Sequence, residues 1–165
     1  MISRRSFLAT SAAAVGVAAL SLRSTAAESF EIMLTDAEWR ARLSPAQFAV
    51  LRQEDTERPF SNSLLGESSP LLAESRDGTY NCAGCELPVY RASTKFDSGT
   101  GWPSFYRAIN GNVRNRNDRS LFGGTRVEEH CRRCGGHLGH VFNDGPAPTG
   151  KRHCINGLAL TFRAA

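Results

Sequence analysis

Apolar residues recur at helical spacing in two short segments early in the chain. Trp39 and Leu43 lie four residues apart in the first segment, and Phe48 and Leu51 lie three apart in the second. Each segment opens with a capping box, in which a hydroxyl and a side chain three residues later satisfy each other's free backbone N–H groups. The two boxes are Thr35-Asp-Ala-Glu38 and Ser44-Pro-Ala-Gln47. This pattern predicts two short helices whose apolar faces pack against a core.

The pattern changes after the helices. The stretch 58–78 is rich in Ser, Pro, Gly and Asn and predicts a long connection on the surface. From Thr79 onward, short β-forming runs are broken by glycines. These predicted strands are 79–80, 88–90, 102–106, 125–129, 138–142 and 158–162. Short, closely spaced strands predict a mainly β (α+β) fold of two antiparallel sheets, packed as a sandwich or rolled barrel.

The first 27 residues have the features of an export signal. Arg4 and Arg5 precede the apolar run 12–20, and the small residues 25–27 form a cleavage site. The alternative is a membrane anchor, but the run is shorter than the about 20 residues that span a bilayer. We expect a twin-arginine signal peptide at 1–27, removed after Ala27, and a periplasmic protein. The remaining residues, 28–165, suit a single domain.

Removal of the signal changes the net charge. The full chain has 20 basic and 16 acidic residues, and without Arg4, Arg5 and Arg23 it has 17 basic and 16 acidic ones. A domain so close to neutral gives little electrostatic reason to expect nucleic acid or an anionic membrane as partner. We expect no nucleic-acid partner, no membrane span after signal removal, and a monomer.

Four of the five cysteines form two C-x-x-C pairs, Cys82/Cys85 and Cys131/Cys134. This spacing lets a tight turn present two thiolates to one ion, and two such turns complete a tetrahedral zinc site. The alternatives are two local disulfides or a thioredoxin-like redox pair. A redox pair normally opens a helix, and neither pair here precedes a helical pattern, which favours zinc. A site filled by four sulfurs has no open position, so the zinc would be structural.

The fifth cysteine, Cys154, has no partner at the C-x-x-C spacing and is a candidate nucleophile. Positive or hydrogen-bonding neighbours lower the pKa of a thiol. Near it in the sequence are Arg152, His153, Asn156, His137 and His140. Each alone is as well explained by a surface charge or a core histidine. Trp102, on a turn with Gly101 and Pro103, is either core or the wall of a pocket for a small apolar group.

As a set, these motifs resemble the type B methionine sulfoxide reductases, which act on the R epimer of methionine sulfoxide. The matching segments are Cys82-x-x-Cys85, Lys95-Phe-Asp-Ser-Gly-Thr-Gly-Trp-Pro-Ser-Phe105, Cys131-x-x-Cys134-Gly-Gly-His-Leu-Gly-His-Val-Phe142, Asp144-Gly-Pro146 and Arg152-His-Cys-Ile-Asn156. The resemblance covers roughly residues 35–162. It implies two antiparallel sheets, with the zinc remote from the chemistry.

The resemblance also implies a role for each matching residue. Cys154 would attack the sulfoxide sulfur, so that methionine leaves and a cysteine sulfenic acid remains. His140 would donate a proton to the sulfoxide oxygen, with His137 and Asn156 as hydrogen-bonding partners. Trp102 would pack on the S-methyl group of the substrate. This is chemically coherent, because a sulfoxide oxygen leaves poorly until it is protonated.

The chain departs from the family at two positions. His153 stands where tyrosine is common, which places a titratable ring beside the nucleophile. Thr100 stands where many members have a second cysteine that closes a disulfide with the nucleophile. We therefore expect the Cys154 sulfenic acid to be reduced directly by an external thiol or a thioredoxin-like donor.

Three functions remain in competition at this point. The first is reduction of methionine-R-sulfoxide, mainly in proteins but also as the free amino acid. The second is a zinc-knuckle interaction module without catalysis, using Arg132, Arg133, Lys151 and Arg152 as a basic contact patch. The third is a thiol-disulfide oxidoreductase, which fails if both cysteine pairs hold zinc. The export signal, and the histidine and asparagine residues near Cys154, favour the reductase.

Overall fold

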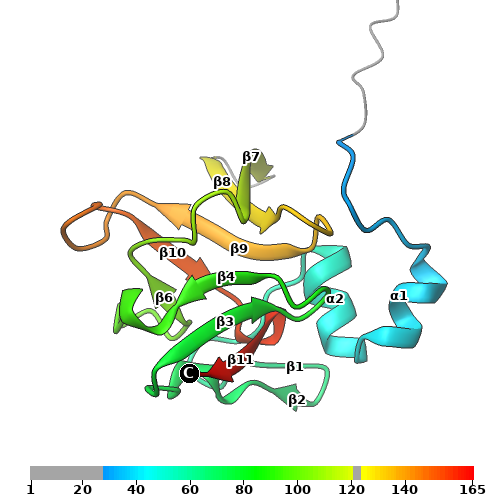
Figure 1. The fold of residues 1–165 in the computed structure, drawn as a ribbon, viewed down its shortest axis with the longest axis horizontal. Coiled ribbons are helices and arrows are strands. Elements are labelled where there is room, and N and C mark those ends of the chain that lie inside the picture. Colours follow the sequence, from blue (N-terminus) through cyan, green and yellow to red (C-terminus); the bar gives the residue numbers. More distant parts are fainter. Residues whose placement is uncertain (1–27, 121–123) are drawn as a thin grey trace, which may run out of the picture.

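The computed structural model describes residues 28–120 and 124–165 (Figure 1). The expected signal peptide, residues 1–27, lies outside the described residues. Within the described ranges, no helix has the length and apolar character needed to cross a membrane.

The two helices that the capping boxes predict are confirmed as α1 (Asp36–Arg42) and α2 (Pro45–Gln53). Both boxes are formed: the Thr35 hydroxyl accepts the N–H of Glu38 at 3.3 Å, and the Ser44 hydroxyl accepts that of Gln47 at 3.2 Å. Trp39 and Phe48 are buried, as the periodicity predicts. Helix α2 packs against strand β9 and the 3-10 turn η3 (Gly157–Ala159), which directly follows the segment of Cys154.

The fold is mainly β, with antiparallel sheets, as predicted. A six-stranded sheet has the order β5 (Lys95–Phe96), β6 (Ser104–Phe105), β10 (Arg152–Ile155), β9 (His137–Phe142), β8 (Gly124–Cys131), β7 (Val113–Ser120). A three-stranded sheet has the order β11 (Leu160–Ala164), β3 (Gly78–Cys82), β4 (Pro88–Arg91). Strands β1 (Ser63–Leu64) and β2 (Glu67–Ser68) form a small separate hairpin, followed by the 3-10 turn η1 (Pro70–Leu72).

Aromatic rings join the two larger sheets. Phe105 of β6 stacks on Tyr90 of β4 with ring centroids 4.4 Å apart, and meets Tyr80 of β3 edge-on at 4.9 Å. All three side chains are fully buried, and rings in this geometry contribute beyond their buried area. In Figure 1 the green strands β3 and β4 lie beside the orange strands β9 and β10. The buried rings therefore hold β6 against the smaller sheet, and β10 is held through its pairing with β6.

Some strands were not predicted because their sequences are largely polar. Strands β7 and β10 were not among the predicted ones, and 102–106 shrinks to the two residues of β6. Strand β7 reads Val-Arg-Asn-Arg-Asn-Asp-Arg-Ser and lies at the edge of its sheet, where a polar sequence is tolerated. The connection 58–78 also contains more structure than predicted, because it holds β1, β2 and η1.

Candidate active site and metal centre

The two cysteine pairs meet in space. Their four Sγ atoms all lie within 4.8 Å of one another, with Cys82 and Cys134 at 3.6 Å and Cys85 and Cys131 at 3.5 Å. A disulfide requires about 2.05 Å, so these sulfurs are free thiols and not bridges. Four sulfurs around one ion at about 2.3 Å would stand about 3.8 Å apart in a tetrahedron. The donor set and spacing therefore fit a closed, structural zinc site.

The backbone builds each pair as a turn at the end of a strand. Cys82 ends β3 and Cys131 ends β8. The carbonyl of Cys82 accepts the N–H of Glu86 at 2.8 Å, and the carbonyl of Cys131 accepts that of Gly135 at 2.8 Å. Each turn thus has the same length, and each closes on a residue with positive φ, 56° at Glu86 and 69° at Gly135. The metal would tie the smaller sheet to the larger one.

Cys154 lies elsewhere, in the middle of β10. It pairs across the sheet with His140 of β9 on one side and with Ser104 of β6 on the other. Its side chain lines a cavity of 120 Å³ together with Trp102, His140 and Asn156. Four residues that the sequence nominated, from three separate segments, therefore meet at one small cavity.

Hydroxyl groups surround the Cys154 sulfur. The Thr100 hydroxyl lies 3.8 Å from Sγ, and Ser98 links Thr100 and Ser104 with oxygen separations of 2.8 and 2.7 Å. Burial raises the pKa of the Cys154 thiol, although the Thr100 hydroxyl and the Arg152 charge act to lower it. Arg152 in turn donates two hydrogen bonds to Asp144, at 2.9 and 2.8 Å. The resting thiol is therefore predominantly protonated near neutral pH.

His140 has its own acidic partner, which the sequence did not nominate. Its Nε2 lies 3.1 Å from Oδ2 of Asp118, and the same oxygen accepts a hydrogen bond from Arg126 at 3.1 Å. Because a carboxylate only accepts, Asp118 holds the ring proton at Nε2. Burial lowers the pKa of His140, and this outweighs the opposing effect of Asp118. The ring is therefore neutral near pH 7 and carries its proton on Nε2, facing Asp118.

His137 is buried and contacts His140 edge-on, with ring centroids 5.4 Å apart. Its Nδ1 lies 2.8 Å from the carboxylate of Glu128, which also pairs with Arg116. Burial acts to raise the pKa of Glu128, but His137 and Arg116 together lower it. Nε2 of His137 has no hydrogen-bond partner in the part of the chain that the structure describes. His137 thus supports the His140 ring from behind and does not line the cavity.

The SelR domain family matches residues 43–164. The chain belongs to the SelR family. The peptide methionine sulfoxide reductase MsrB of Thiobacillus denitrificans is 50% identical over 129 residues, which cover 78% of this chain and 92% of that protein. The MsrB of Methanosarcina barkeri is 50% identical over 130 residues, covering 78% and 86%. That of Alteromonas mediterranea is 49% identical over 131 residues, covering 79% and 87%.

Within this SelR domain, Glu57 is a site residue that the sequence reading missed. It is buried, and its two carboxylate oxygens accept the N–H groups of Gly157 at 2.6 Å and Leu158 at 2.8 Å. Burial raises its pKa, although these two N–H groups act to lower it. Its backbone carbonyl accepts the indole N–H of Trp102 at 3.1 Å, and its backbone N–H donates to Asn156 at 3.1 Å. Glu57 therefore connects the aromatic wall to the end of the nucleophile strand.

His153 faces away from the SelR cavity. Its Nδ1 lies 2.8 Å from the buried carboxylate of Glu129, and its ring contacts Tyr90 at 5.7 Å. Residues alternate between the two faces of a strand, so His153 and Cys154 necessarily point to opposite sides of β10. The ring next to the nucleophile in sequence therefore belongs to the core side of the sheet.

Proposed function

We propose that this protein reduces the R epimer of methionine sulfoxide, mainly in peptides and proteins, with Cys154 as nucleophile. The observation that carries the proposal is the single small cavity lined by Cys154, His140 and Trp102. A volume of 120 Å³ suits the end of a methionine side chain and little more. The likeness to proteins named peptide methionine sulfoxide reductase supports the same assignment.

In the first step, the Cys154 sulfur attacks the sulfur of the substrate, and the S–O bond of the sulfoxide breaks. The oxygen is transferred to Cys154, the transient bond between the two sulfurs breaks, and the products are a cysteine sulfenic acid and methionine as the thioether. The cysteine sulfur loses two electrons and the substrate sulfur gains them. The proton that the thiol loses is balanced by the proton that the oxygen gains, so the overall step is neutral.

His140 and Trp102 prepare the substrate for this attack. The sulfoxide oxygen is a hydrogen-bond acceptor and replaces Asp118 as the partner of Nε2–H on His140. The indole of Trp102, held by the carbonyl of Glu57, forms the apolar wall for the S-methyl group. Arg152 and Thr100 favour the thiolate as the substrate excludes water from the cavity.

The sulfenic acid is then reduced by an external thiol. One thiol forms a mixed disulfide with Cys154 and releases water, and a second frees the cysteine. Thr100 lies beside Cys154 where a second cysteine would serve, and the other four cysteines are gathered in the metal cluster. Cys82, Cys85, Cys131 and Cys134 would hold zinc, which would cross-link the two sheets and take no part in the reaction.

We also propose that residues 1–27 are a twin-arginine signal, that residues 28–165 form the reductase domain, and that the mature protein is a periplasmic monomer. The twin arginine, the short apolar run and the small residues before Glu28 support this. N-terminal sequencing of the protein purified from the periplasm tests it. A mature chain that begins at Glu28 is expected, and retention in the cytoplasm would contradict it.

The proposed activity is tested with the separated R and S epimers of N-acetyl methionine sulfoxide and dithiothreitol as reductant. We expect turnover of the R epimer alone, and its loss in Cys154→Ser. A folded, zinc-containing protein that turned over neither epimer would contradict the enzyme assignment. The zinc-knuckle interaction module that the sequence left open would then be the better explanation.

A further inference from the structure

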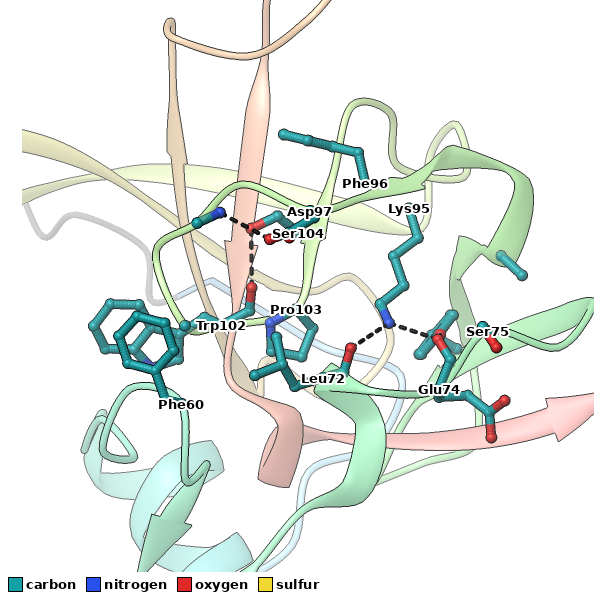
Figure 2. A pocket seen from close by; sticks show the side chains of 14 residues that line it. Phe60, Leu72, Glu74, Ser75, Lys95, Phe96, Asp97, Trp102, Pro103 and Ser104 are labelled. Atoms are coloured by element: carbon teal, nitrogen blue, oxygen red, sulfur yellow. Dashed lines mark hydrogen bonds between the residues drawn. The ribbon is translucent and has the colours of Figure 1, made fainter.

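A second, larger cavity also has Trp102 in its lining, like the one that Cys154 lines. Its volume is 530 Å³, within the range of about 300–1,000 Å³ typical of ligand sites. Trp102 lines both cavities, and Ser104, which pairs with Cys154 across the sheet, lines this one as well. Figure 2 shows Trp102 and Phe60 at one end of the cavity, Lys95 and Glu74 at the other, and Leu72 and Pro103 between them. The proposed catalytic cavity and this one therefore share a wall.

Phe60 is the unusual feature of this cavity. Its side chain is 69% exposed, and its φ is 63°, in the left-handed region that residues with a Cβ rarely adopt. Its N–H donates to the carbonyl of Gly101 at 2.8 Å, and its ring packs so closely there that a Cβ on Gly101 would come within 2.9 Å of it. Strained backbone that holds an exposed aromatic beside a cavity is a feature of binding sites. The ring is held next to Trp102 at a cost in backbone strain.

The polar groups of the cavity are already engaged within the protein. The Lys95 ammonium donates to the carbonyls of Leu72 at 2.7 Å and Glu74 at 2.6 Å (Figure 2). The Glu74 carboxylate accepts hydrogen bonds from Arg76, and that of Asp97 accepts the N–H of Gly99 at 2.9 Å. The main surfaces left for a ligand are therefore apolar. They belong to Phe60, Leu72, Phe96, Trp102 and Pro103.

We propose that this cavity is a subsite for an apolar or aromatic side chain that flanks the oxidised methionine in a protein substrate. The proposal rests on the proposed function, because Trp102 lines both the cavity that would take the methionine sulfoxide and this one. A flanking side chain then reaches the second cavity within a few residues, since an extended chain advances about 3.3 Å per residue. Phe60 and Trp102 supply the contact area, and methionine oxidation disrupts hydrophobic cores, whose apolar residues are the kind of side chain that this cavity would take.

The test compares peptides with a single methionine-R-sulfoxide in a glycine and serine background. One phenylalanine is placed in turn at each of the three positions on either side, and aspartate replaces it in a matched set. Each enzyme's kcat/KM for a peptide is divided by its own value for N-acetyl methionine-R-sulfoxide, so changes in the chemical step cancel. We expect phenylalanine at one position or more to raise this ratio about tenfold over aspartate.

The variant Phe60→Ala should reduce this preference to about twofold, and Phe96→Ala, on another wall, should weaken it independently. Leu65→Ala is the matched control, because Leu65, in the turn between β1 and β2, has a positive φ of 50° and is 67% exposed, but does not line the cavity. It should keep the full preference. Equal ratios for all wild-type peptides, or equal losses in all three variants, would overturn the subsite. Absence of turnover on the N-acetyl substrate would instead contradict the proposed function.

Discussion

The molecule uses cysteine in two regions with opposite surroundings. Cys82, Cys85, Cys131 and Cys134 lie in turns at strand ends, and their sulfurs face one another within 4.8 Å. Cys154 lies in mid-strand, and its sulfur faces a hydroxyl, a guanidinium and a cavity. The first set can satisfy a metal ion completely, whereas Cys154 has no second sulfur beside it. The groups around each cysteine therefore determine whether its thiol is structural or reactive in this fold.

The largest expected effect comes from breaking the metal side of this comparison. Cys131→Ser removes one of four ligands, and structural zinc contributes about 10–16 kcal/mol to small domains, which is comparable to a whole folding free energy. We expect this variant to lose its metal and to lack cooperative thermal unfolding. Cys154→Ser is the matched control and should keep one zinc per chain and a near wild-type melting curve. Metal analysis with circular dichroism measures both, and a well-folded, metal-free Cys131→Ser would show that the cluster is dispensable.

Next in size is the loss of the acid on the reactive side. His140→Gln should lower kcat by about 10²–10⁴ fold, because the sulfoxide oxygen loses its proton donor. The zinc content should not change, since His140 lies outside the cluster. His153→Tyr is the histidine control, and because His153 faces Glu129 on the core side, we expect a change of less than about tenfold. Similar kcat losses in the two variants would contradict the assignment of His140.

A third variant addresses the support of the reactive region. In Glu57→Gln, an NH₂ group replaces one of the two carboxylate oxygens that accept backbone N–H groups. One buried backbone N–H then faces another donor and loses its acceptor. We expect a loss of about 1–3 kcal/mol in unfolding free energy, measured by urea denaturation. Glu54→Gln is the control, because Glu54 is exposed and pairs with Arg116 at the surface, where an ion pair contributes about 1 kcal/mol or less. Equal losses of unfolding free energy in Glu57→Gln and Glu54→Gln would contradict a supporting role for Glu57.

The smallest expected effect is a shift in pH dependence. The pKa of Cys154 is raised, so its thiolate fraction, and the rate of alkylation by iodoacetamide, should increase as the pH rises through that value. Thr100→Val removes a group that lowers this pKa, so the curve should move to higher pH by about one unit or less. Thr161→Val, on β11 and bonded to Glu86, should leave it in place. A shift to lower pH in Thr100→Val would contradict the role of the hydroxyl.

Much of the fold was predictable because its signals are local. The capping boxes fixed where α1 and α2 begin, and the spacing of the cysteines was enough to predict that both pairs share one site. The strand of the nucleophile was missed because Arg152, His153 and Cys154 are chosen for chemistry and ion pairing, which hides the alternation typical of a strand.

The supporting carboxylates could not be predicted for a different reason. Glu57 and Asp118 are 22 residues or more from their partners in the sequence, and Glu128 lies on the strand next to that of His137. Nothing local in the sequence distinguishes these three residues from surface acids. Only the sheet register, which pairs Glu128 with His140 and Asp118 with Arg126, brings the acids to the histidines. A buried acid is identified by its tertiary partners, and these cannot be inferred from the residues next to it in the sequence.

The division of labour among the five cysteines is the central claim, and one experiment tests it most directly. The zinc-loaded protein is given one equivalent of methionine-R-sulfoxide peptide without reductant and examined by intact and peptide mass spectrometry. We predict one added oxygen on Cys154, trapped by dimedone, with zinc still bound and no disulfide. Thr100→Cys, which places a thiol beside Cys154, is the positive control for disulfide detection. A disulfide between Cys154 and any of the four cluster cysteines, or oxidation of the cluster with loss of zinc, would contradict the account.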